Sequence, residues 1–239
     1  MSNTFRRKEI KFLLEPRQRA ALERAMRGRM EADEYGESTI LSLYYDTPDS
    51  RLIRRSLEKP DYKEKLRLRS YGTARPDGKI FIELKKKYDG IVYKRRIAMR
   101  EATATAWLAG RIDRPEDSQI AREIDWFRGF YDGLRPAMLL AYDRVAYFCP
   151  EDENLRITLD RNIRWRTENL TLTAPPLGEQ LLRPGQSLLE IKCADAMPLW
   201  LVDALNENGI RQISFSKYGT AYTTELTRAI TEKGGIHCA

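Results

Sequence analysis

Three segments that follow one another along the chain alternate polar and apolar residues, and this alternation limits the fold more than any other feature. The segments are Lys65–Arg69, Phe81–Lys87 and Ile91–Arg96. A period of two residues is typical of a β-strand that has one buried face and one polar face. The dipeptide Asp89-Gly90, between the last two segments, predicts a tight hairpin turn. We therefore expect neighbouring antiparallel strands in this region.

The polar face of these strands is almost wholly cationic. The first strand presents Lys65, Arg67 and Arg69 opposite Leu66 and Leu68, and the second presents Glu83, Lys85 and Lys87 opposite Ile82 and Leu84. Like charges that face one another across a ladder destabilise a sheet, so a merely solvated face should mix both charge signs. The pattern predicts a bound anion, and a phosphate chain fits it. For any one strand, a half-buried sheet with its polar side in water is the alternative.

Composition also favours a polyanionic partner. The chain has 42 Lys and Arg against 35 Asp and Glu, a net charge of +7, which suits nucleic acid, phosphorylated small molecules or an acidic membrane surface. No apolar run approaches the roughly 18 residues that span a bilayer, and Met1–Lys8 lacks the apolar core of a secretion signal. Cys149, Cys193 and Cys238 have no metal-binding or redox spacing, so we expect a reducing, cytoplasmic location.

Catalysis or metal binding by histidine is disfavoured, because the chain has one histidine, His237, which is the third residue from the C-terminal end. This argues against Ser-His or Cys-His catalysis and against a histidine metal cage. Carboxylates, lysines, arginines and hard cations that prefer oxygen ligands remain.

The other segments predict an α+β fold made of one domain over residues 1–239. Further strands are expected at 5–14, 39–45, 137–148, 155–160 and 187–192, and helices at 16–34, 103–109, 115–131, 198–208 and 217–233. Thr47 and Pro48 resemble the start of another helix. Amphipathic helices can cover the aliphatic faces of the strands from outside, which would turn the charged faces inward. A closed antiparallel barrel with a polar, basic lumen satisfies this pattern and leaves no sheet edge.

Fourteen charged residues are candidates for the lumen: Glu9, Lys11, Arg67, Arg69, Glu83, Lys85, Lys87, Lys94, Arg96, Arg144, Arg156, Glu190, Lys192 and Lys217. Cations outnumber carboxylates more than threefold, so a substrate with several negative charges and a metal ion held on Glu would balance the set. Glu190 is the best single metal-ligand candidate because it lies among aliphatic residues. Alternatively, Glu190 pairs with Lys192 or with an arginine across the sheet.

Seven short motifs now carry a family resemblance. They are Glu9-Ile10-Lys11, Lys65-Leu66-Arg67-Leu68-Arg69, Glu83-Leu84-Lys85, Tyr142-Asp143-Arg144, Arg156-Ile157-Thr158-Leu159-Asp160, Leu189-Glu190-Ile191-Lys192 and Phe215-Ser216-Lys217-Tyr218. In this order they resemble the VTC domain, the catalytic domain of polyphosphate polymerases in the triphosphate tunnel metalloenzyme (CYTH-like) superfamily. The resemblance spans Arg7 to Tyr222.

The resemblance implies an eight-stranded tunnel in which the terminal phosphoryl group of ATP is transferred to a growing polyphosphate chain, with Mn²⁺ or Mg²⁺ assisting. By motif position it implies phosphate contacts from Lys11, Arg67, Arg69, Lys85, Arg144 and Arg156, and from Ser216 and Lys217 at the rim. Lys94 could be replaced in this role by Arg95 or Arg96. Glu190, with Glu83, would hold the metal, and Glu9, Lys87 and Lys192 would add substrate contacts. A membrane or regulatory partner protein is also implied.

Two departures from the family pattern affect the expected reaction. Arg7 replaces the first carboxylate of a Glu-x-Glu-x-Lys motif, which favours transfer over hydrolysis, and Ser214 stands where a basic residue is expected. A tripolyphosphatase or nucleoside triphosphatase on the same fold is the alternative, as is a non-catalytic module that binds polyphosphate. Nucleic-acid binding predicts aromatic residues interleaved with the basic ones. It is disfavoured because the partners of Arg and Lys between Lys65 and Arg96 are mainly other charges.

Overall fold

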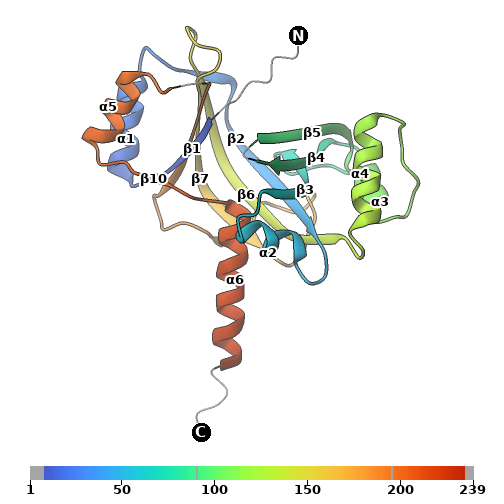
Figure 1. Cartoon of the computed structure of the whole chain (residues 1–239). Helices are drawn as coiled ribbons and strands as arrows, with labels where there is room; N and C mark the ends of the chain where they lie inside the picture. Colours follow the sequence, from blue (N-terminus) through green and yellow to red (C-terminus); the bar gives the residue numbers. More distant parts are fainter. Residues whose placement is uncertain (1–7, 90, 195, 235–239) are drawn as a thin grey trace. The chain divides into compact units, whose positions relative to one another are not determined.

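The computed structural model describes residues 8–89, 91–194 and 196–234, with side chains up to residue 231 (Figure 1). Arg7, Gly90, His237 and Cys238, named above, lie outside the described residues. The elements in chain order are β1 (Lys8–Leu14), α1 (Pro16–Met26), β2 (Glu31–Asp46), α2 (Arg51–Leu57), β3 (Tyr62–Tyr71), β4 (Lys79–Tyr88), β5 (Ile91–Arg100), α3 (Glu101–Leu108), α4 (Gln119–Phe130), β6 (Arg135–Phe148), β7 (Arg156–Arg166), β8 (Glu179–Gln180), β9 (Ser187–Cys193), α5 (Leu199–Glu207), β10 (Gln212–Ile213) and α6 (Lys217–Gly234). Within these residues, no helix combines the length and the apolar character that crossing a bilayer requires.

The ten strands form one hydrogen-bonded sheet, so the α+β class predicted from the sequence is confirmed. Their order is β10-β1-β9-β7-β6-β2-β3-β4-β5, and β8 pairs with β7. The expected number of eight strands is wrong, since the described sheet has ten; two of them, β8 and β10, have only two residues each and were not predicted. The pairings run from β10 at one end to β5 at the other, and a pairing that would join these ends is not among those of the described strands. Closure into a barrel therefore stays a prediction.

The chain divides into two compact units. The first comprises the described residues of Met1–Thr39, Tyr142–Ile163 and Leu182–Phe215, and the second comprises those of Ile40–Ala141, Arg164–Leu181 and Ser216–Ala239. The strands β2, β6 and β7 each continue from one unit into the other.

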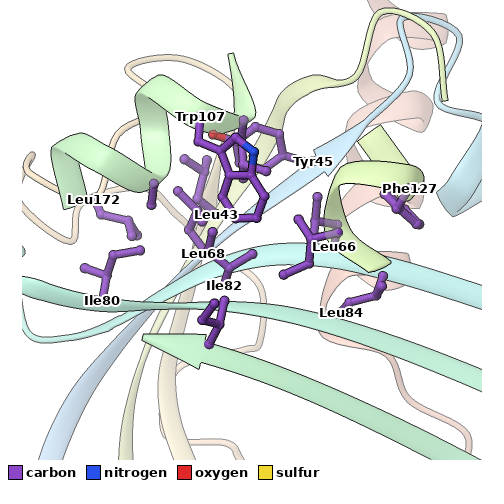
Figure 2. Packing of buried hydrophobic residues seen from close by; sticks show 14 of the residues in the cluster. Leu43, Tyr45, Leu66, Leu68, Ile80, Ile82, Leu84, Trp107, Phe127 and Leu172 are labelled. Atoms are coloured by element: carbon purple, nitrogen blue, oxygen red, sulfur yellow. The ribbon is translucent and has the colours of Figure 1, made fainter. Parts of the chain in front are cut away.

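In the second unit, the aliphatic faces of β3 and β4 pack beneath α3 and α4 (Figure 1). Leu66 pairs with Leu84 and Leu68 with Ile82 across the ladder, and all four side chains are fully buried. Figure 2 shows these side chains gathered beneath the helices that carry Trp107 and Phe127. The alternation predicted from the sequence is confirmed here, and the polar residues of both strands consequently lie on the opposite face of the sheet.

In the first unit, α1 and α5 pack side by side and cover the aliphatic face of β1, β7 and β9 (Figure 1). The core consists of Phe12, Leu14, Leu22, Met26, Met30, Leu155, Ile157, Leu159, Leu189, Ile191, Cys193, Leu201, Leu205 and Ile210. Both units thus follow the same rule, with aliphatic residues under helices and charged residues on the other face.

The expected helix over 16–34 is wrong beyond Met26. The helix ends at the C-cap residue Arg27, and Gly28 follows with a φ of 72°, a conformation that glycine adopts without a steric penalty. The chain then enters β2 at Glu31, eight residues before the strand predicted from Thr39.

The helix expected to begin at Thr47 and Pro48 begins later, at Arg51, and its N-cap residue is Ser50. Thr47 nevertheless contributes to capping, because its hydroxyl accepts a hydrogen bond from the Arg51 backbone N–H at 2.9 Å. The helix predicted over 115–131 likewise begins at Gln119, where the Ser118 hydroxyl accepts from the Ala121 backbone N–H.

Candidate functional site

Cationic side chains form rows across the polar face of β3, β4 and β5 in the second unit. Read across the ladder, the rows are Lys63–Lys87, Lys65–Lys85–Lys94 and Arg67–Glu83–Arg96. Side chains directly opposite one another on one face have Cβ atoms about 5 Å apart, so the charges within a row interact strongly. These three rows, together with Arg69, which lies two residues beyond Arg67 on the same face of β3, define what we call the lysine–arginine face. It brings together the predicted residues Arg67, Arg69, Glu83, Lys85, Lys87, Lys94 and Arg96.

Glu83 is the carboxylate at the centre of the lysine–arginine face, and its side chain is only 1% exposed. Arg67 Nη2 lies 2.7 Å from Glu83 Oε2, and Lys94 Nζ lies 2.8 Å from Oε1. Arg96 Nε is 3.4 Å and Arg69 Nη1 is 3.6 Å from the same carboxylate. Burial alone would raise the pKa of Glu83, but Arg67, Arg69 and Lys94 outweigh it and lower the pKa to about 2. One permanent negative charge therefore faces four positive charges.

The excess positive charge of the lysine–arginine face disfavours the charged form of its lysines. Burial is the main cause that lowers the pKa of Lys63, and repulsion from Lys87 and Lys59 adds to it. Burial also lowers the pKa of Lys94, with two neighbouring arginines adding to the effect and Glu83 opposing it. A polyanion laid along this face would relieve the repulsion.

The first turn of α6 adjoins the lysine–arginine face. Lys65 Nζ donates a hydrogen bond to the Ser216 hydroxyl at 3.3 Å, and the Gly219 backbone N–H donates to the same oxygen at 3.2 Å. Lys217 is the first residue of the helix. The predicted rim residues Ser216 and Lys217 therefore lie at a helix N-terminus, which favours negative charge, next to a row of lysines.

Three residues near this turn were not predicted as site residues. Asp46, fully buried at the end of β2, accepts hydrogen bonds from the backbone N–H groups of Leu52 at 2.8 Å and Ile53 at 3.0 Å. It also accepts from the Tyr218 hydroxyl at 2.9 Å. Tyr218 in turn stacks on Tyr44, with ring centroids 4.4 Å apart. Asp46 thus joins β2, α2 and α6, while the two tyrosines cover one side of the cations.

Tyr44 interacts directly with a predicted phosphate ligand, because Arg67 Nη1 donates a hydrogen bond to the Tyr44 hydroxyl oxygen at 2.9 Å. Burial raises the pKa of this hydroxyl, but Arg67, Lys65 and Arg69 together lower it to about 8. Ser42 and Tyr44 are two residues apart on β2 and pair with Arg69 and Arg67. The same period of two would have indicated Tyr44 had it been followed into β2.

In the first unit, Glu190 of β9 lies between two cations. Lys11 Nζ is 3.6 Å from Glu190 Oε1, and Arg144 Nη2 is 3.7 Å from Oε2. Lys11 Nζ is also 3.1 Å from Glu9 Oε1, and it donates a hydrogen bond to the Phe215 carbonyl at 3.1 Å. Glu9 and Glu190 therefore share one ammonium group.

Arg144 forms a bidentate ion pair with Asp160, with Nε–Oδ1 and Nη2–Oδ2 distances of 2.6 and 2.8 Å. Burial opposes the charged form of Arg144. The neighbouring Tyr142, Asp160 and Glu190 outweigh burial and raise the pKa of the guanidinium well above its ordinary value. Arg144 stays charged and is held in a fixed orientation.

The other two predicted cations of this unit lie opposite one another across the ladder. Arg156 lies opposite Lys192 across β7 and β9, and Lys192 lies opposite Glu9 across β9 and β1. Arg156 is exposed and its guanidinium lies 5.4 Å from the centre of the Phe148 ring. The first unit therefore brings together all six predicted residues that belong to it: Glu9, Lys11, Arg144, Arg156, Glu190 and Lys192.

The two predicted metal ligands differ in how well they fit a divalent ion. Glu190 fits, because a second carboxylate, Glu9, shares its ammonium partner, and the buried Thr158 hydroxyl on the paired strand has no hydrogen-bond partner among the described residues. Oxygen atoms of these kinds suit Mg²⁺ and Mn²⁺. Glu83 does not fit, because four cations already surround it. No group of three or more His, Cys, Asp or Glu side chains placed to hold a metal occurs in the described part of the chain.

Comparison with known proteins identifies the family of the chain. A family model described as the VTC domain matches residues 6–225. Subunit 4 of the vacuolar transporter chaperone complex of Schizosaccharomyces pombe is 25% identical over 226 residues, covering 76% of this chain and 31% of the relative. Subunit 2 of the same complex is 26% identical, covering 79% of this chain and 32% of the relative. The chain thus spans about a third of the length of these relatives.

Two solved structures share the fold at low sequence identity. One, from Vibrio parahaemolyticus, has a TM-score of 0.53 and 13% identity and covers 90% of this chain and 97% of its own. The other, from Bacillus halodurans, has a TM-score of 0.53 and 15% identity and covers 87% and 92%. Both are described as a "putative adenylate cyclase". At this identity the likeness concerns the fold alone.

Proposed function

Because this chain belongs to the VTC domain family, we propose that it is a metal-assisted phosphotransferase, which adds the terminal phosphoryl group of ATP to a growing inorganic polyphosphate chain. The observation that carries the proposal is the lysine–arginine face, where four cations surround one buried carboxylate. Such a face needs an anion with several charges at fixed spacing, and a phosphate chain has them. The closed barrel predicted from the sequence belongs to this proposal but is not needed for its tests.

Phosphoryl transfer requires mainly alignment and charge neutralisation from a protein. In the second unit, Arg67 and Arg69 would hold non-bridging phosphate oxygens through charge-assisted hydrogen bonds. Lys85 and Lys94 would neutralise the adjacent charges. Glu83 orients the two arginines and Lys94, so the face needs little rearrangement when it binds phosphate.

Taken by itself, the first unit offers a candidate metal site and a second set of candidate phosphate contacts. Glu190 and Glu9 would hold Mn²⁺ or Mg²⁺, which offsets negative charge on phosphate oxygens when it is bound. Lys11, now shared by these carboxylates, would contact phosphate instead. Arg144, kept in place by Asp160, would contribute a rigid guanidinium, and Arg156 an exposed one.

The direct test is to incubate the full chain with ATP and Mn²⁺, with and without a short polyphosphate primer. Long polyphosphate on a gel, with a matching amount of ADP, is the expected result. Orthophosphate as the sole product would replace the proposal with a tripolyphosphatase or nucleoside triphosphatase. Tight polyphosphate binding without any product would leave a binding module.

Arg67→Ala tests the role of the lysine–arginine face in this reaction. We expect the rate to fall at least about 100-fold, the typical effect of removing one charge-stabilising donor from an active site. The fold should survive, because Glu83 keeps three cationic neighbours. The matched control is Arg95→Ala, which removes an exposed arginine paired with Glu123 on the other face of the sheet. A wild-type rate for Arg67→Ala would contradict the proposal.

The cellular setting is a further part of the proposal. The named relatives are subunits of a vacuolar transporter chaperone complex. We therefore include a membrane or regulatory partner protein in the proposal, and we keep the cytoplasmic location that the sequence predicts.

A further inference from the structure

One end of the lysine–arginine face is aromatic. Tyr71 lies two residues beyond Arg69 on β3, on the same face, which is about 7 Å farther along the strand. Phe81 pairs with Arg69 across the ladder and shares this face. Tyr71 and Phe81 meet edge to face, with ring centroids 6.0 Å apart and planes at 90°. At the other end, the face finishes with Lys63 and Lys87.

Arg96 connects this aromatic pair to the phosphate-binding cations. Its guanidinium carbon lies 3.4 Å from the centre of the Phe81 ring, and its Nη2 donates a hydrogen bond to the Tyr71 hydroxyl at 3.2 Å. The same guanidinium lies 3.4 Å from the Glu83 carboxylate. One face of Phe81 is therefore covered, whereas Tyr71 remains 55% exposed.

The structure points to a nucleobase subsite at Tyr71, and this inference rests on the proposed function. The base of a nucleoside triphosphate would stack on the exposed ring of Tyr71. The phosphates of the same nucleotide would extend over Arg69 and Arg67, and over the other cations that surround Glu83. Phe81 and Arg96 would hold the Tyr71 ring in place. This arrangement also sets a direction, because the terminal phosphate would then lie toward Lys65 and Lys85.

The chemistry of the subsite limits its selectivity. Stacking accepts any base because every base has a π-face, and larger rings stack better. Groups that would read base edges are few at this end, where the neighbouring charges are Lys79, 5.7 Å from the Phe81 ring centre, and Arg100, which pairs with Lys79 across the ladder. We therefore expect similar affinity for adenine and guanine nucleotides and weaker binding of cytosine nucleotides.

The test compares a nucleotide with a phosphate chain that has no base. Binding of the β,γ-imido analogue of ATP and of tripolyphosphate would be measured by calorimetry on the full chain with Mn²⁺. Tyr71→Ala should weaken nucleotide binding roughly 5- to 150-fold, the effect of losing one stacking contact. Tripolyphosphate binding should change less than about twofold. Tyr71→Phe should bind both ligands like the wild type.

Two further variants keep the result interpretable. Tyr88→Ala is the matched control, since Tyr88 is 58% exposed on the same sheet but lies on the opposite face. It should change neither affinity. Tyr71→Leu keeps an apolar contact for Phe81 while removing the stack, so it replaces Tyr71→Ala should that variant unfold.

The outcomes separate this inference from the proposed function. If Tyr71→Ala and Tyr71→Leu weaken both ligands equally, or neither, the nucleobase subsite is overturned while the phosphate site stands. If the wild type binds neither ligand, the proposed function is overturned and the subsite with it.

Discussion

Glu83→Gln tests whether the buried carboxylate serves as a counter-charge. The substitution keeps the shape of the side chain but removes the charge that four cations share. Burial opposes ionisation of Glu83, yet Arg67, Arg69 and Lys94 lower its pKa from the ordinary 4.5 to about 2. At 1.36 kcal/mol per pKa unit, the ionised form adds about 3 kcal/mol to the free energy of unfolding at neutral pH. Breaking a buried ion pair from one side typically has an effect of similar size.

The expected result at pH 7, without ligand or metal, is a melting temperature lower by about 6–12 °C. This follows from about 2–4 °C per kcal/mol for a chain of this size. Because the pKa is depressed in the folded state, the contribution is fully present above pH 4.5 and is lost as the pH falls toward 2. The difference between wild type and variant should therefore shrink below pH 4.5.

Thermal melts monitored by circular dichroism, repeated from pH 7 downward, provide the assay. Glu116→Gln, at an exposed carboxylate, is the matched control and should leave the melting temperature unchanged. Tripolyphosphate should raise the melting temperature of Glu83→Gln more than that of the wild type, at equal ionic strength. Two results together would refute the reasoning: a melting temperature of the variant within 2 °C of wild type, and stabilisation by Mn²⁺ of the wild type but not of the variant. They would support a metal-ligand role for Glu83.

Two other predictions concern the residues around this face. The hydroxyl of Tyr44, whose pKa burial raises but three cations lower to about 8, should ionise between about pH 7 and 9 and give a tyrosinate absorbance step that Tyr44→Phe removes. Because this pKa is depressed in the folded state, the stability of the wild type relative to Tyr44→Phe should rise as the pH increases from 8 to 10. A single absorbance step near pH 10 for all tyrosines would contradict the lowered pKa of Tyr44. Asp46→Asn should lower the free energy of unfolding in urea by about 2–4 kcal/mol, because the fully buried carboxylate accepts from two backbone N–H groups of α2 and from Tyr218. Asp113→Asn, at an exposed carboxylate in the segment between α3 and α4, is its control and should change stability by less than about 0.5 kcal/mol.

The strands of the lysine–arginine face could be predicted because their signal is local. Alternation between Lys65 and Arg96 specifies both faces without reference to any other segment, and the core residues Leu66 and Ile82 confirm it. The end of α1 was missed for the opposite reason. Met30 continues the helical spacing of Leu22 and Met26, which extends the predicted helix past Gly28, whereas β2, which begins at Glu31, takes its partner strands β3 and β6 from elsewhere in the chain.

The candidate site was predicted as a set of residue types but not as an arrangement. The sequence indicated one carboxylate among many cations, but not that four of those cations would surround Glu83, because this depends on the register between β3, β4 and β5. The resemblance implied Glu83 as a metal ligand, and its cationic surroundings argue against that role. Tyr44 was missed because the alternation of the neighbouring strands was not followed into the strand predicted at 39–45, which belongs to β2.

The alternation of β3 and β4 has a consequence for how relatives of this protein can diverge. Neighbouring residues of one strand serve two different purposes, since Leu66 builds the core and Arg67 the cationic face. A one-residue insertion or deletion inside either strand would exchange the two faces, placing arginines beneath the helices and leucines at the site. This surface can therefore change by substitution rather than by insertion or deletion, whereas length can vary more readily in the turn at residues 72–78 between β3 and β4. Homologous sequences should consequently align without gaps through these strands, and gaps should accumulate at that turn.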